Sequence, residues 1–185
     1  MKNPFVAVDD ALLRICTRFS HKLQRTVGLT NYFIAKIGVA MAALSLLAEI
    51  LNYSYKFLRY YHIGTFALAI DGFLLLSMIL RTLHLSEAEN NLDDIKPAAL
   101  KGYTGSLVWR IFWLIALLVD WIAIARPPRE PRFLLAVVVT TFFSNGMLIF
   151  YYFVEVNPLP PAKSKLKEWL EKFYAAKARA VTVGA

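Results

Sequence analysis

Four long apolar segments dominate the pattern of hydrophobic and polar positions along this chain of 185 residues. They cover residues 32–51, 63–80, 106–125 and 133–154. Each is about as long as the roughly 18-residue stretch that a helix needs to cross a hydrocarbon core. The pattern therefore predicts an all-α polytopic membrane protein with four transmembrane helices.

The amino-terminal segment, residues 9–27, has a different pattern that is typical of an amphipathic helix. Apolar side chains recur on one face at Leu12, Cys16, Phe19 and Leu23. A parallel stripe is basic and consists of Arg14, Arg18, Lys22 and Arg25. Asp9 or Asp10 is expected to cap the first turn, because a carboxylate accepts its free amide hydrogens. Such a helix lies in an anionic interface or packs on its own bundle or a partner subunit, and both interpretations stay open.

The carboxy-terminal segment predicts a second amphipathic helix. Residues 157–161 are rich in proline, which cannot continue a helix, so they should end the fourth span. Between residues 163 and 180 an apolar stripe includes Trp169, with basic Lys165 and Lys167 beside it. The chain then has three predicted parts: an amino-terminal helix over 1–30, a membrane domain over 31–156 and a basic tail over 157–185.

Composition and charge agree with this division. Apolar residues make up 58% of the chain and charged residues only 18%, a balance that a soluble domain of this size does not need. The formal net charge is +8, and the basic residues flank the spans. Contact with anionic lipid explains such placement better than nucleic-acid binding does. No nucleic-acid partner is expected.

The connections carry the topology signal. Most lysines and arginines fall on the side that holds both termini and the connection between the second and third spans. The positive-inside tendency therefore predicts that both termini face the cytosol or its equivalent, such as a matrix. Residues 86–94 of the central connection are predicted to form an acidic loop, closed by Pro97 and Gly102.

Polar residues inside the spans are the candidates for mechanism: Lys36, Glu49, Asp71, Arg110, Asp120 and Asn145. Each ionisable group costs about 2.5–3.5 kcal/mol at membrane depth, so it should face another helix, water or an interface. One hypothesis is a conducting path for a cation or proton through Asp71, Asp120 and Asn145. The favoured hypothesis is structural: Asp71 and Asn145 lie at similar depth and should bond each other, while Arg110 and Lys36 snorkel to an interface.

Catalytic signals are missing from the sequence. It has no paired-histidine zinc motif, nucleophile elbow or phosphate-binding glycine loop, and Cys16 is its single cysteine. No enzyme activity, cofactor or metal is expected. A lipid-modifying enzyme with an unrecognised site is the weakest of the alternatives.

Five segments, in order, resemble the peroxisome-elongating peroxin family, the eleventh peroxins. They are the D-x-L-L-R helix at 10–14 with Arg18 and Phe19, the S-x-K-x-x-R segment at 54–59, the aspartate-led span at 69–77, the R-x-x-W-L span at 110–114 with Asp120, and the S-N-G-M segment within 143–147. Gly72 stands where the family favours Asn, and the tail after Pro161 is outside the pattern. The resemblance implies a non-enzymatic protein that self-associates and elongates organelle membranes through its amphipathic amino-terminal helix; some members are proposed to be pore-like.

The expected function is therefore that of a non-catalytic structural membrane protein, peroxin-like, which shapes membrane or serves as an accessory subunit of a large organellar complex. Its expected partners are anionic lipid headgroups and other membrane subunits or copies of itself. A peroxisomal membrane or the mitochondrial inner membrane is the expected location. The alternative is a small ion channel or proton-coupled transporter centred on Asp71, Asp120 and Asn145.

Overall fold

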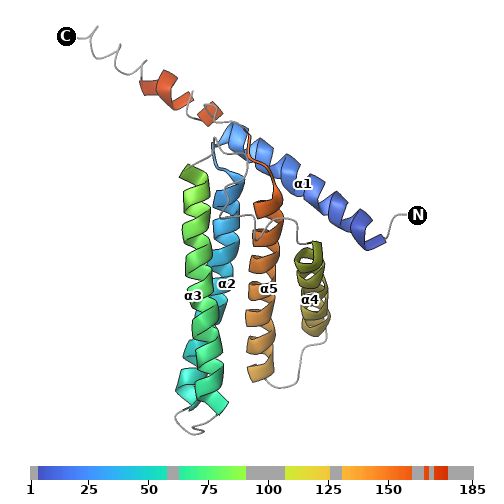
Figure 1. Ribbon diagram of the computed structural model, residues 1–185, viewed down its shortest axis with the longest axis vertical. Helices are drawn as coiled ribbons and strands as arrows, with labels where there is room; N and C mark the ends of the chain where they lie inside the picture. Colours follow the sequence, from blue (N-terminus) through green and yellow to red (C-terminus); the bar gives the residue numbers. More distant parts are fainter. Residues whose placement is uncertain are drawn as a thin grey trace, which may run out of the picture.

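The computed structural model describes residues 4–57, 63–90, 107–125, 131–159, 165–166 and 169–174. Its main helices are α1 (Pro4–Thr26), α2 (Asn31–Phe57), α3 (Ile63–Asn90), α4 (Leu107–Ala125) and α5 (Pro131–Glu155) (Figure 1). The described residues contain no strand, and α2 to α5 are each long and apolar enough to cross a membrane. The predicted all-α fold with four membrane-spanning helices is confirmed.

The four spanning helices stand side by side in the order α3, α2, α5, α4, and α1 lies across one end of them (Figure 1). The most extensive packing joins α2 to α5, and α3 and α4 flank this pair. Most of the buried side chains belong to α2 and α5, among them Ala35, Val39, Phe150 and Val154. The outer helices expose apolar side chains such as Phe73 and Val108, as helices that face lipid do.

Two glycines set the closest approach of α2 and α5. A Cβ placed on Gly38 would lie 2.5 Å from the carbonyl oxygen of Gly146, and a Cβ on Gly146 would lie 2.5 Å from that of Gly38. Small residues at a membrane helix interface let two backbones come this close. The central helix pair therefore depends on having no side chain at either position.

Helix α1 begins at Pro4, ahead of the predicted start. Proline suits the first turn, because the amide hydrogen that it lacks would have no helical partner there. Asp9 and Asp10 consequently lie inside the helix, and the predicted cap at either residue is wrong. The helix closes at Gly28, whose φ of 87° is accessible to glycine and whose amide donates to the carbonyl of Gln24 at 3.0 Å.

Helix α3 continues well past its predicted end. The predicted acidic loop starts at Ser86, yet the helix runs to Asn90. The first half of the predicted loop is therefore helical. The reason is burial: Leu85 and Ala88 are fully buried, and this packing extends the helix through the acidic residues. Residues 91–102, with the rest of the predicted loop, lie outside the described residues.

Candidate functional site: a docked amphipathic helix

A buried cluster of polar side chains joins α1, α4 and α5. Arg110 donates from Nε to Asp9 Oδ1 at 2.9 Å and from Nη2 to Asp9 Oδ2 at 2.8 Å. Tyr152 donates its hydroxyl to Asp9 Oδ1 at 2.9 Å, and the guanidinium of Arg110 lies over the Tyr152 ring. Glu155 lies 3.8 Å from Arg110 Nη1. Two parallel hydrogen bonds between a guanidinium and a carboxylate form the strongest kind of side-chain pair.

This cluster corrects the expectation that Arg110 snorkels to water. The Arg110 side chain is 8% exposed and that of Asp9 is 2% exposed, so both charges are enclosed. Desolvation raises the pKa of Asp9, but the hydrogen bonds from Arg110 and Tyr152, together with the Arg110 charge, outweigh it and hold the pKa below its ordinary value. Asp9 is therefore ionised at neutral pH and neutralises Arg110 inside the fold.

Sequence reasoning missed this contact although one signal was available. Asp9 precedes Leu12 by three positions and Cys16 by seven, so it stands in phase with the apolar side chains of the predicted inward face. A carboxylate on the inward face of an amphipathic helix needs a cationic partner. Its partner lies 101 positions away on α4, a separation that helical periodicity does not reveal.

The other end of α1 is held by the segment that follows α5. Gln24 donates from Nε2 to the carbonyl of Leu159 at 2.8 Å and accepts the Leu159 amide at 2.9 Å. His21 Nε2 bonds the carbonyl of Asn157 at 2.9 Å. With Asp9 near its start and Gln24 near its end, α1 is fixed along its length to the membrane domain.

The predicted lipid-contacting residues of α1 divide between two environments. Leu12 and Leu23 are half-buried and pack against the core of the bundle, as does Cys16. Phe19 is 53% exposed and touches Phe153 edge to face. The exposed apolar side chains of α1 are Phe5, Val8, Ile15 and Phe19, which are here called the apolar stripe.

The four predicted basic residues all lie on the exposed surface of α1. Arg14, Arg18, Lys22 and Arg25 are here called the basic stripe. At 3.6 residues per turn, this stripe lies about 100° around the helix from the apolar stripe. Helix α1 therefore has three faces: one docked on the bundle, one apolar and exposed, and one basic and exposed.

The carboxy-terminal residues contribute less to the described structure. Trp169 is exposed and stacks on Phe173, with ring centroids 5.6 Å apart. Lys165 lines a cavity together with part of the basic stripe. Lys167 lies outside the described residues.

Lys36 is also paired, but it is less enclosed than Arg110, with 24% of its side chain exposed. Its ammonium group bonds Oε2 of Glu89, and the Thr30 hydroxyl donates to Oε1 of the same carboxylate at 2.7 Å. The Thr30 hydroxyl also accepts the amide of Phe33, which caps the start of α2. This contact ties the beginning of α2 to the last turn of α3.

The three residues of the predicted conducting path are not brought together. Asn145 donates to the carbonyl of Thr141 on its own helix at 2.8 Å, and no hydrogen bond joins it to Asp71 in the described residues. The predicted Asp71–Asn145 bond is therefore wrong. Helices α3 and α5 each pack mainly on α2, and their direct contact runs through Arg81 rather than Asp71. Asp120 accepts from Thr140 at 3.3 Å. Arg59 and Arg126, the cationic partners that its position near the helix end suggests, lie outside the described residues.

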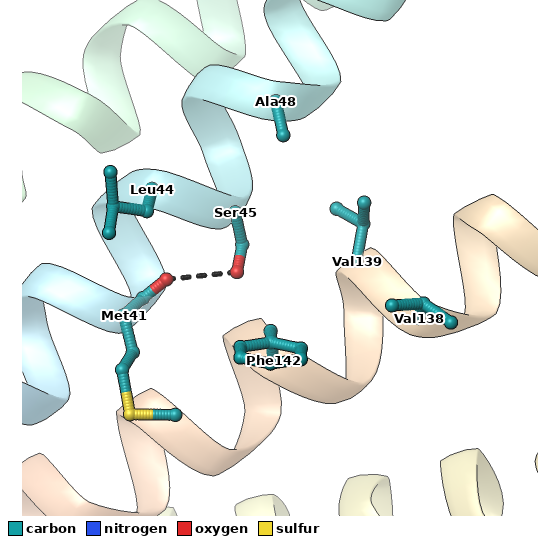
Figure 2. A pocket seen from close by; sticks show the side chains of 7 residues that line it. All are labelled: Met41, Leu44, Ser45, Ala48, Val138, Val139 and Phe142. Carbon is teal, nitrogen blue, oxygen red and sulfur yellow. Dashed lines mark hydrogen bonds between the residues drawn. The ribbon is translucent and has the colours of Figure 1, made fainter.

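A cavity of about 250 Å³ lies between the halves of α2 and α5 remote from α1 (Figure 2). Its lining residues are Met41, Leu44, Ser45, Ala48, Val138, Val139 and Phe142. The Ser45 hydroxyl donates to the carbonyl of Met41 at 2.9 Å, as the dashed line in Figure 2 shows, so the side chains of the lining offer no free hydrogen-bond donor. This cavity suits hydrocarbon rather than an ion or a polar substrate.

The fold and these contacts define a polytopic all-α membrane protein with an amphipathic helix docked across one end of its spanning helices. The chain matches no protein-family model, no curated protein sequence and no solved structure. Its described residues contain no group of three or more His, Cys, Asp or Glu side chains that could hold a metal ion.

The single cysteine reports on whether α1 is docked. Burial raises the pKa of Cys16 to about 11, so the reactive thiolate is scarce at pH 8. We expect the thiol of the folded chain in mild detergent to be alkylated about 100-fold more slowly than in denaturant. Mass spectrometry of the alkylated fraction over time measures this difference. Equal rates in the two conditions would show that α1 is not docked.

Proposed function

We propose that this chain is a non-catalytic structural membrane protein in which α1 acts as an amphipathic wedge in one leaflet. The observation that carries the proposal is the arrangement of α1, which is fixed to the bundle on one face and leaves the apolar and basic stripes exposed on the other two. A helix of this kind sits at the boundary between headgroups and acyl chains, with its apolar side toward the hydrocarbon.

The energetics of α1 favour a membrane surface over water. Fully burying one large apolar side chain contributes about 1.5–3 kcal/mol, and the apolar stripe has four. Each basic residue near an anionic surface adds about 1 kcal/mol. Because α1 is held by Asp9 and Gln24, this insertion occurs at a set position beside the spanning helices, where it widens one leaflet relative to the other.

The polar contacts inside the protein support a static framework rather than a conducting path. Arg110 and Lys36 are each neutralised by a carboxylate on another helix. Asp71, Asp120 and Asn145 lie on three different helices and share no hydrogen bond in the described residues.

The resemblance to the eleventh peroxins agrees with a role in elongating an organelle membrane, and the peroxisome is the location that we propose.

Full-length protein reconstituted in liposomes with anionic lipid should convert round vesicles into tubules or smaller vesicles. The double variant Ile15→Ser/Phe19→Ser should lose most of this activity, because removing two large side chains weakens insertion by at least about 3 kcal/mol, or about 100-fold. Electron microscopy and dynamic light scattering measure vesicle shape and size.

The matched control is Ala11→Ser, an exposed position on the basic face of the same helix and away from the apolar stripe, which should behave as the unmodified chain does. Vesicles that keep their shape with unmodified protein would refute membrane shaping. If the double variant instead releases the chain from a larger complex during native purification, the apolar stripe binds another subunit, and the accessory-subunit role replaces the wedge.

A further inference from the structure

A cavity of about 430 Å³ lies between α1 and the segment that follows α5. Three members of the basic stripe line it, Arg18, Lys22 and Arg25, together with His21, Thr26 and Lys165. No carboxylate belongs to the lining, and in the described part of the chain no carboxylate pairs with these three basic residues. Four cationic side chains therefore share one hollow without a counter-charge from the lining.

Two segments that are distant in the sequence build this cavity. His21 holds the carbonyl of Asn157, and Gln24 holds both backbone groups of Leu159, so the chain leaving α5 is tied to α1. Lys165 follows a few residues later and completes the lining. The cavity is thus a product of the docking of α1, and an isolated amphipathic peptide would lack it.

The composition of the lining favours one kind of ligand. Guanidinium groups such as those of Arg18 and Arg25 bind phosphate oxygens through paired hydrogen bonds, and ammonium groups add point charges. Four like charges in one hollow repel each other, so a ligand with several negative charges relieves more repulsion than one with a single charge. The volume lies within the range of pockets that hold small molecules, which is more space than a lone ion needs.

We propose that this cavity binds the headgroup of a lipid that carries phosphomonoester groups. The lipid source follows from the neighbouring apolar stripe, since the exposed Phe19 lies three positions before Lys22 of the lining and is therefore its neighbour on the helix surface. An acyl chain attached to the bound headgroup can lie along that stripe. This inference rests on the proposed function, because both place α1 at a membrane surface.

The test uses full-length protein in mild detergent and measures lipid retention by native mass spectrometry. A phosphoinositide with two phosphomonoester groups should be retained in preference to phosphatidylserine, which has none. The double variant Arg18→Gln/Arg25→Gln should weaken this retention at least tenfold, because each arginine supplies charged hydrogen bonds. Lys165→Gln should weaken it by a smaller factor, about threefold to tenfold.

The matched control is Arg14→Gln. Arg14 belongs to the same basic stripe, but it does not line the cavity and instead donates to the carbonyl of Asp10 at 3.1 Å. It should change retention less than twofold. The alkylation rate of Cys16 in each variant shows whether α1 stays docked, so a loss of folding is distinguished from a loss of binding.

Three results would overturn the proposal. Equal weakening by Arg14→Gln and Arg18→Gln/Arg25→Gln would mean diffuse surface charge rather than a site. Equal retention of phosphatidylserine would remove the phosphomonoester preference. Displacement of the lipid by an equal concentration of the soluble inositol phosphate would show that the cavity binds a soluble phosphate compound rather than a lipid. Vesicle shaping is measured separately, so it can persist when headgroup selection fails, and the two proposals are distinguishable.

Discussion

Replacing Asp9 with alanine should release α1 from the membrane domain. The change removes the carboxylate that neutralises Arg110, which then remains enclosed with only the more distant Glu155 nearby. Breaking a buried ion pair by removing one partner costs about 3–5 kcal/mol, because the remaining charge is desolvated and uncompensated. In mild detergent, the variant should show faster alkylation of Cys16 and faster hydrogen exchange along α1 than the unmodified chain.

Two further variants separate the charge from the packing. Tyr152→Phe removes one hydrogen bond to the carboxylate and should cost about 1.5–3 kcal/mol, less than Asp9→Ala. The double variant Asp9→Leu/Arg110→Met removes both charges and should restore much of the docking. Asp10→Ala is the control, since Asp10 lies outside the contact with Arg110. Unchanged protection of α1 in Asp9→Ala would contradict the assigned role of the pair.

The same contact predicts how docking depends on pH. Because the folded pKa of Asp9 is below the ordinary value of about 3.9, its contribution is fully present above that value. The contribution is lost as the pH falls through the folded pKa, where the carboxylate takes up a proton. Helix α1 should therefore stay docked at pH 5 and detach only below about pH 4, as hydrogen exchange measured across this range would show.

Adding a single methyl group at Gly38 or Gly146 should disrupt the central helix pair. In either variant the new Cβ would lie 2.5 Å from a backbone carbonyl oxygen of the facing helix, and that atom cannot rotate away as a side chain does. Overpacking of this kind costs about 1–3 kcal/mol, and more where only backbone can move. We expect Gly38→Ala and Gly146→Ala to lower the midpoint of thermal unfolding in detergent and to reduce the yield of folded protein.

Gly72→Ala is the matched control. Gly72 also lies within a spanning helix, but a Cβ there would have no atom within 4 Å, so the variant should be neutral or slightly stabilised. Equal effects at all three glycines would mean that helix propensity, rather than the contact between α2 and α5, governs the outcome. Unaltered stability at Gly38 and Gly146 would place the two helices farther apart than described.

The spanning helices could be predicted because their signal is local. Whether a segment prefers lipid to water depends on the sum of its own side chains over about 20 residues, so the apolar stretches identify α2 to α5 without any tertiary information. The same holds for the amphipathic pattern of α1. Even here the helix ends differ from the predicted ones. Helix α3 runs on to Asn90 because Leu85 and Ala88 are buried in the fold, and hydropathy alone does not predict that burial.

The partners of the polar groups were decided by the tertiary structure. Arg110 and Lys36 each looked able to reach an interface, yet both pair with carboxylates on other helices. Asp71 and Asn145 remain unpaired with each other despite their similar depth. Periodicity assigned the residues of α1 to faces, but it did not say which face docks. That choice, and the cavity beside Lys165, depend on contacts between segments more than 100 positions apart, whose energies no local window of sequence contains.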